Sequence, residues 1–157
     1  MKADAILRVT EALRDLLSAA LLKAGLPGTV FAGPLDDVAS SGAVLTLFLY
    51  RIVPNASLRN HEQDVLWPPI PLDLHFLITV GSTSDSSEET LLHSLGCAIQ
   101  AIAFNPILTG PALSGETVRV ALAALNSEDW KLFPNISDRT SVACLASPVL
   151  IDPPVKE

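Results

Sequence analysis

The segment from Ala43 to Val53 is apolar on both faces of a two-residue alternation, and this pattern limits the fold more than any other feature. One face would carry Val44, Phe48, Tyr50 and Ile52, and the other face would carry Leu45, Leu47 and Leu49. Such a strand favours a position inside a sheet that is covered on both sides, rather than a position at an exposed edge.

A second segment, Leu72 to Val80, alternates more regularly and predicts another strand of the same sheet. Its first face would carry Leu72, Leu74, Phe76, Ile78 and Val80, and its second face Asp73, His75, Leu77 and Thr79. The first face is entirely apolar, so we expect it to lie against a hydrophobic core.

Two amphipathic helices are predicted to pack on this sheet. The first spans Asp4 to Ala24, with Asp4 as its N-cap and apolar residues recurring three and four positions apart. The second spans about Ser87 to Asn105, with Ser87 as its cap and Pro106 after its end. Its expected buried stripe is Leu91, Leu92, Leu95, Ile99, Ile102 and Ala103.

Shorter elements complete the predicted order. They are strands at Thr29–Ala32, Thr117–Ala123 and Ser141–Ser147, the last stopped by Pro148, and a helical turn at Ser127–Phe133 that starts at a serine cap. Together these elements predict an α/β (α+β) fold with a single mixed or antiparallel sheet of four to five strands and two main helices packed on it. The length of 157 residues fits a single domain over 1–157.

The charge balance and hydropathy exclude some classes of partner. Ten Lys and Arg residues against 17 Asp and Glu give a net charge of −7, which argues against binding to nucleic acid. The most apolar stretch, Ala43 to Tyr50, is far shorter than the roughly 20 residues that cross a bilayer, so we expect no membrane segment. Charged residues interrupt the N-terminal apolar residues, so we expect no signal peptide and synthesis in the cytoplasm.

The sequence offers little catalytic chemistry. It contains no GxSxG, SxxK, GxxxxGK or GxGxxG motif, and His61, His75 and His93 are not spaced as metal ligands. Asp73 and His75 share a strand face about 7 Å apart and could form an ion pair. We therefore expect no enzyme, no cofactor and no metal, and keep a small enzyme using Asp73 and His75, with His61 nearby, as an alternative.

The connection from Pro54 to Pro71 is unusually long for a small domain. It contains Leu58, Leu66, Trp67 and Ile70, with prolines at both ends. One interpretation is that Trp67 and Leu66 fold back onto their own domain. The other, which we favour, is an ordered arm that faces a partner.

Four stretches together indicate a family. They are Leu47–Arg51 with Pro54–Asn55, Ser57–Asn60, Pro69–Thr79 and Ser147–Asp152. In order and spacing the chain resembles the N-terminal domain of the cap, or tail-terminator, proteins of phage-tail-like extracellular contractile injection systems, of the antifeeding-prophage and virulence-cassette type. The resemblance covers nearly the whole chain and implies a phage tail-terminator-like fold.

The resemblance implies a structural role in assembly. Such a protein would form a homo-oligomeric ring, a hexamer, on the end of the inner tube and contractile sheath, ending polymerisation and joining sheath to tube. The chain would then be a component of the assembled particle, released by lysis. The subunit interface expected on this hypothesis comprises Leu58, Arg59, Asn60, Leu66, Trp67, Asp73 and His75. Another non-enzymatic joining or adaptor module of phage-tail-like particles is the alternative within this class.

Overall fold

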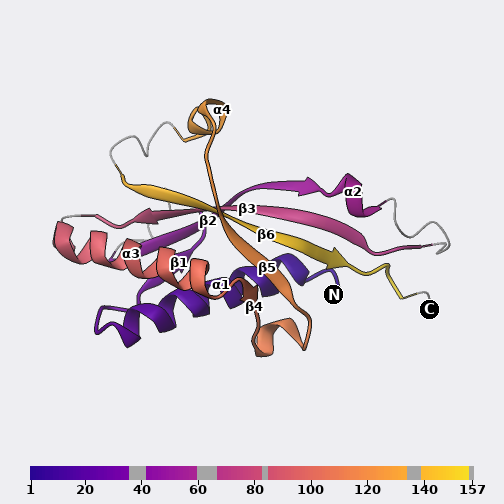
Figure 1. Cartoon of the computed structure of the whole chain (residues 1–157), viewed down its shortest axis with the longest axis horizontal. Coiled ribbons are helices and arrows are strands. Elements are labelled where there is room, and N and C mark those ends of the chain that lie inside the picture. The colour runs from indigo at the N-terminus through magenta and orange to yellow at the C-terminus, as the bar shows by residue number, and fades with distance from the viewer. Residues whose placement is uncertain (36–41, 60–66, 83–84, 134–138, 156–157) are drawn as a thin grey trace.

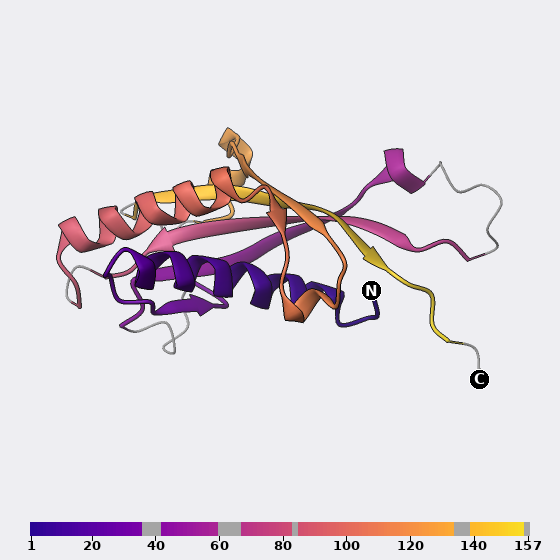
Figure 2. The ribbon, with the colours of Figure 1, turned by 60° about the horizontal axis from the view of Figure 1, so that its bottom comes forward.

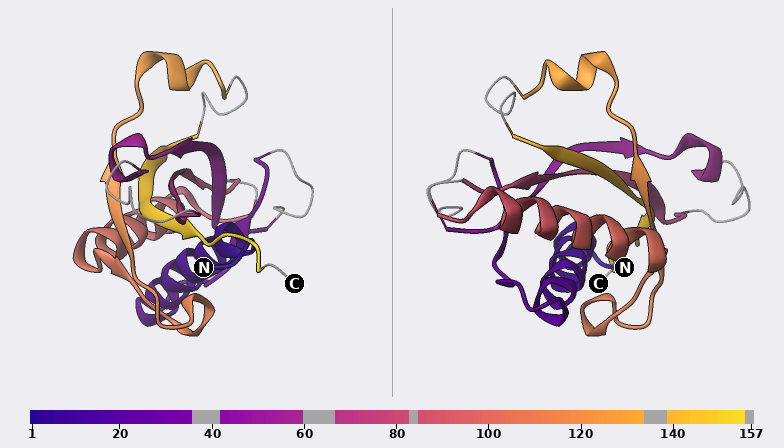
Figure 3. Two further views of the ribbon diagram at one scale, coloured as in Figure 1. Left: turned by 90° about the vertical axis from the view of Figure 1, so that its right-hand side faces the viewer. Right: turned by 60° about the vertical axis from the view of Figure 1, so that its left-hand side comes forward.

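The computed structural model of the chain describes residues 1–35, 42–59, 67–82, 85–133 and 139–155. The elements in chain order are α1 (Ala5–Lys23), β1 (Val30–Ala32), β2 (Leu45–Pro54), α2 (Ala56–Arg59), β3 (Ile70–Val80), α3 (Glu88–Phe104), β4 (Ile107–Leu108), the 3-10 helix η2 (Pro111–Leu113), β5 (Val118–Ala123), α4 (Ser127–Trp130) and β6 (Ser141–Ile151). The strands form one curled sheet, with α1 and α3 on one side of it and α4 on the other side (Figures 1 and 3).

The sheet has six strands in the order β1-β2-β3-β6-β5-β4. β1 runs parallel to β2, while the other neighbouring pairs are antiparallel, so the sheet is mixed. The expectation of four to five strands is therefore slightly wrong. The additional strand is β4, which pairs with β5 only through Ile107 and Leu108 and is too short to produce an alternation in the sequence.

The two long helices agree with their predicted ranges to within a residue or so. Ser87 caps α3 as predicted, because its hydroxyl accepts a hydrogen bond from the backbone N–H of Thr90 at 3.2 Å. Asp4 does not cap α1 with its side chain. Its carboxylate instead accepts a hydrogen bond from Nε of Arg8 at 2.6 Å, because residues four apart lie side by side on a helix.

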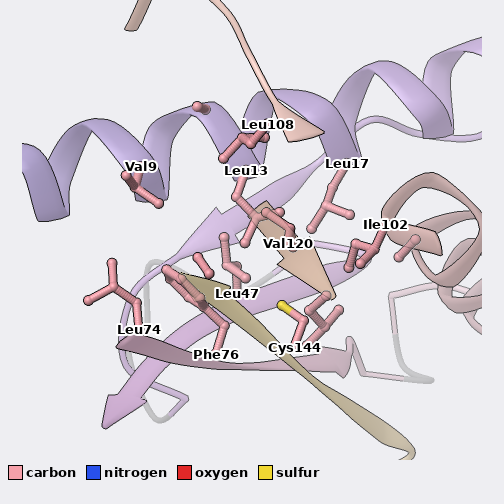
Figure 4. Packing of buried hydrophobic residues seen from close by; sticks show 14 of the residues in the cluster. Val9, Leu13, Leu17, Leu47, Leu74, Phe76, Ile102, Leu108, Val120 and Cys144 are labelled. Carbon is pink, nitrogen blue, oxygen red and sulfur yellow. The ribbon is translucent and has the colours of Figure 1, made fainter. Parts of the chain in front are cut away.

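Apolar side chains fill the space between these helices and the sheet (Figure 4). The cluster includes Val9, Leu13 and Leu17 of α1, Ile102 of α3, and Leu47, Leu74, Phe76, Leu108, Val120 and Cys144 of the strands. Full burial of a Leu or Phe side chain contributes about 1.5–3 kcal/mol relative to its exposure. The predicted apolar face of β3 thus lies against the core, as expected.

The second face of the sheet is covered in its middle by the chain around α4. The ring of Phe133 packs edge-on against Tyr50 and Phe48, with ring centroids 5.1 and 6.2 Å away. Leu77 of β3 is fully buried beneath this cover. β2 lies inside the sheet with its first residues buried, which confirms the position expected from its two apolar faces.

β6 continues past its predicted end at Ser147 and reaches Ile151. The β3–β6 register shifts at Asp73, and the resulting bulge leaves Ser147 and Pro148 without Cα partners on β3. Proline has no N–H to donate to a strand ladder, and a bulge is a position where that donor is not needed. The strand therefore accommodates Pro148 instead of stopping before it.

The predicted start of α4, with Ser127 as its cap, is also wrong. The cap is Asn126 rather than Ser127: its side-chain oxygen accepts a hydrogen bond from the N–H of Asp129 at 2.8 Å. The Asp129 carboxylate in turn accepts one from the N–H of Asn126 at 3.3 Å. Asparagine is as good an N-cap as serine, and the acidic residue three positions later completes a capping box.

Candidate functional site

The connection between β2 and β3 projects from one end of the molecule. The ends of both strands extend past α1 and α3, and α2 follows the end of β2 there (Figures 1 and 2). We call the described residues of this projection, 52–59 and 67–71, the arm. The predicted interface residues Leu58 and Trp67 lie on it.

Large apolar side chains are exposed along the arm. Trp67 is 60% exposed, Ile70 46%, Ile52 42% and Leu58 40%. Ile52 pairs across the strands with Leu74, which is fully buried under the helical layer. Ile52 and Ile70 thus continue the apolar face of the sheet beyond the part that the helices cover, and this leaves apolar side chains exposed there.

Asp73 lies at the base of the arm and is half-buried. Its Oδ1 accepts a hydrogen bond from Nδ2 of Asn55 at 3.1 Å and another from the hydroxyl of Ser147. Within the described chain, no ion pair joins Asp73 to His75, so the pair that the sequence suggested does not form. Asp73 is instead satisfied by neutral donors from β6 and from the residue after β2.

His75 lies farther along the same face of β3, beside Tyr50, with ring centroids 6.1 Å apart. Burial lowers the pKa of His75 below its ordinary value, and the positive charge of Arg51 lowers it further. Asp73 and Asp129 act in the opposite direction. The lowered pKa favours the neutral imidazole, which lies half-buried beside Tyr50.

The sequence did not indicate the contact between Arg51 and Asp129. Nη1 of Arg51 lies 3.5 Å from Oδ1 of Asp129, a carboxylate that is only 5% exposed as a residue. With Phe133 against Tyr50, this contact ties α4 to the second face of the sheet. The spacing of Asn126 and Asp129 was the signal that could have revealed the α4 capping box.

Some predicted residues cannot be placed. Asn60, Leu66 and His61 lie outside the described residues, as does the side chain of Arg59. Among the residues that are described, no group of three or more His, Cys, Asp and Glu could hold a metal ion. In the same part of the chain, no helix is both long and apolar enough to cross a membrane.

A surface groove between α1 and α3 lies on the helical side of the sheet, away from the face that carries Asp73 and His75. Its lining is Leu16, Ala19, Ala20, Lys23, Ala24, Cys97, Gln100, Ala101, Phe104 and Asn105. The groove contains no histidine and no carboxylate, so it brings together no acid–base pair.

Comparison with known proteins identifies a family and a fold. The model of the Pvc16 N-terminal domain family matches residues 8–157. The chain is similar to the sheath/tube terminator of an extracellular contractile injection system, PVC, solved by cryo-EM in the extended state, with 20% identity and a TM-score of 0.60. It is also similar to the tube-terminating cap of the anti-feeding prophage, with 20% identity and a TM-score of 0.65. A comparison with curated proteins gave no match.

The two similarities extend over nearly the whole of this chain but not over the whole of the other proteins. They cover 97% and 95% of this chain, against 61% and 58% of the terminator and the cap. The chain thus spans about three-fifths of the length of either protein. At 20% identity these likenesses show that the fold is shared.

Proposed function

The chain belongs to the Pvc16 N-terminal domain family, and we propose that it acts as a cap, or tail terminator, of a contractile injection particle. It forms a ring of six copies on the end of the inner tube and sheath, ends their polymerisation and joins sheath to tube. Residues 1–157 act as one tail-terminator-like domain. The protein is made in the cytoplasm and becomes part of the particle.

The observation that carries this proposal is the family match over residues 8–157. It is supported by a fold shared, over nearly the whole chain, with a sheath/tube terminator and a tube-terminating cap. Because those two proteins are longer, nothing that depends on their remaining parts is included in the proposal.

The arm is the proposed contact between neighbouring copies. A closed ring of identical subunits uses two different surfaces of each copy, and a projection at one end can reach the next copy. Trp67 is exposed in the single chain and is the side chain expected to contribute most, since aromatic residues that become buried at an interface often dominate its binding energy. Leu58, which is also exposed, would add apolar area to the same contact. Arg59, Asn60 and Leu66 belong to the same proposed contact by their place in the chain.

Asp73 and His75, the other two predicted interface residues, are half-buried. In this proposal they touch the neighbour at most through their exposed edges. Asp73 is already engaged by Asn55 and Ser147, and this favours a structural role over the alternative of a small enzyme that uses Asp73 and His75.

Light scattering on the purified protein, combined with electron microscopy of growing tubes, tests this function. We expect a species with the mass of a ring, and we expect added protein to shorten the tubes and to sit at their ends. A protein that stays monomeric and leaves tube length unchanged at every concentration contradicts the proposal.

Trp67→Ala tests the arm within that experiment. The variant should keep the wild-type melting temperature, because the side chain is exposed, but should need a higher concentration to form rings. Trp130→Ala is the matched control. Trp130 is also exposed, at 45%, but it belongs to α4, which lies apart from the arm (Figure 1). Unfolding of the Trp67 variant would instead place that ring in the core of its own subunit.

A further inference from the structure

We infer that Asp73 is a positioning residue, which sets the direction of the arm through hydrogen bonds to Asn55 and Ser147. The inference rests on the proposed function, since the use of the arm as a subunit contact belongs to that proposal. It differs from the expectation that Asp73 itself lies at the subunit boundary or in a catalytic pair.

The carboxylate of Asp73 joins three strands where the arm leaves the sheet. Its Oδ1 accepts hydrogen bonds from Nδ2 of Asn55, directly after β2, and from the hydroxyl of Ser147 on β6. A carboxylate oxygen can accept more than one hydrogen bond, so one such group can hold donors from both neighbouring strands together.

Asn55 connects Asp73 to the outer part of the arm through further hydrogen bonds. Its side-chain oxygen accepts hydrogen bonds from the hydroxyl of Ser57 at 2.7 Å and from the backbone N–H of Leu58 at 3.3 Å. Its own backbone N–H donates to the carbonyl of Pro71 at 2.9 Å. The turn of α2, which carries the exposed Leu58, is therefore held to Asp73 and Pro71 of β3 by the side chain and the backbone of one residue, Asn55.

The position of Asp73 in the sheet explains why it influences direction. The register of β3 with β6 shifts between Leu72 and Leu74, so Asp73 lies at a bulge. The extra residue lies on β6, where Ser147 and Pro148 stand opposite Asp73, and a bulge bends its strand and increases the local twist. The hydrogen bonds of Asp73 therefore join β3 and the residue after β2 to β6 at this bulge, beside which the arm leaves the sheet, while the apolar core lies on the opposite face of β3.

Variants of this cluster test the inference by hydrogen exchange and by ring formation. At a concentration too low for rings, Asp73→Ala should speed exchange at the Leu58 amide about tenfold and leave α3 unchanged. It should also raise the concentration at which rings form by about tenfold. Asp73→Asn, which keeps the accepting oxygen, should show wild-type values of both the Leu58 exchange rate and the concentration at which rings form.

Two serines on the same strand give a matched pair in case Asp73→Ala does not fold. Ser147→Ala removes the donor to Asp73, whereas Ser141→Ala removes the hydrogen bond to Thr79, whose hydroxyl lies 2.9 Å away at the other end of β3. We expect only Ser147→Ala to affect Leu58 exchange and ring formation.

Two outcomes overturn the inference. In the first, Asp73→Ala and Ser147→Ala leave both ring formation and Leu58 exchange unaffected. In the second, exchange becomes faster throughout the chain, α3 included. Failure of the proposed function is a separate result. In that case the wild type forms no ring at any concentration, while Leu58 exchange still reports on the hydrogen bonds of Asp73.

Discussion

Tyr50 and Arg51 of β2 lie beside His75 on the face of the sheet below α4. Because burial and the charge of Arg51 lower the pKa of His75, the folded protein binds fewer protons at this site than the unfolded chain, in which the histidine has a pKa of about 6.5. Stability is therefore lost as the pH falls from about 6.5 towards the lower pKa of the folded state.

His75→Gln isolates this contribution, because glutamine does not titrate. Between pH 7 and pH 5 we expect the melting temperature of the wild type to fall more than that of the variant. Thermal unfolding followed by circular dichroism at several pH values measures the difference. If the two curves stayed parallel, the lowered pKa of His75 would have no influence on stability.

Replacement by alanine should change stability in opposite directions at two glycines. At Gly96, on the exposed side of α3, a Cβ would meet nothing within 4 Å, so Gly96→Ala should raise the free energy of unfolding by about 0.5–1 kcal/mol. At Gly81 a Cβ would lie 2.1 Å from the carbonyl oxygen of Ala43, so Gly81→Ala should lower it. Urea denaturation measures both, and a stabilised Gly81→Ala would show that the strand end can move aside.

For single residues, local spacing in the sequence predicted which side chains lie close together on one strand. It did not reveal hydrogen-bond partners that are distant along the chain. Asp73 and His75 do share the second face of β3, as alternation predicts. The hydrogen-bond partners of Asp73 are Asn55 and Ser147, which lie 18 and 74 positions away. No local pattern contains such pairings, so the role of Asp73 at the base of the arm could not be predicted.

At the scale of elements, long periodic segments were predictable because their periodicity reflects the surface that they bury. This holds for α1, α3, β2 and β3. It does not hold for β4, which is too short, or for the end of β6, where a bulge accommodates Pro148. The apolar second face of β2 required a cover, but the sequence did not show that the chain around α4 provides it.

Two leucines of α3 test how the helix is rotated on the sheet. Both belonged to the predicted buried stripe, but Leu95 is 6% exposed and Leu92 is 47% exposed. Leu95→Ala should lower the free energy of unfolding by about 2–5 kcal/mol, and Leu92→Ala by less than about 1 kcal/mol. Chemical denaturation of both variants measures this, and equal losses would mean that α3 packs with a different face.

At the scale of the whole molecule, two layers and a projection at one end account for the proposed role. The helical layer and the sheet bury the core between them, while the arm extends past the helices with its apolar side chains exposed (Figure 2). The prolines and the tryptophan of residues 54–71 predicted an arm that faces a partner, and this stays a prediction; Trp67 itself is exposed. No single stretch of the sequence shows which surface of the neighbouring copy would receive the arm, so this surface could not be predicted.

A cryo-EM reconstruction of the end of an assembled particle would show whether this chain closes it as a ring. We predict a closed ring of this chain above the last layer of tube and sheath, in which the arm of each copy lies against the next copy and Trp67 is buried between them. A ring whose arms rest on their own subunits, or a particle end without this chain, would contradict the proposed function.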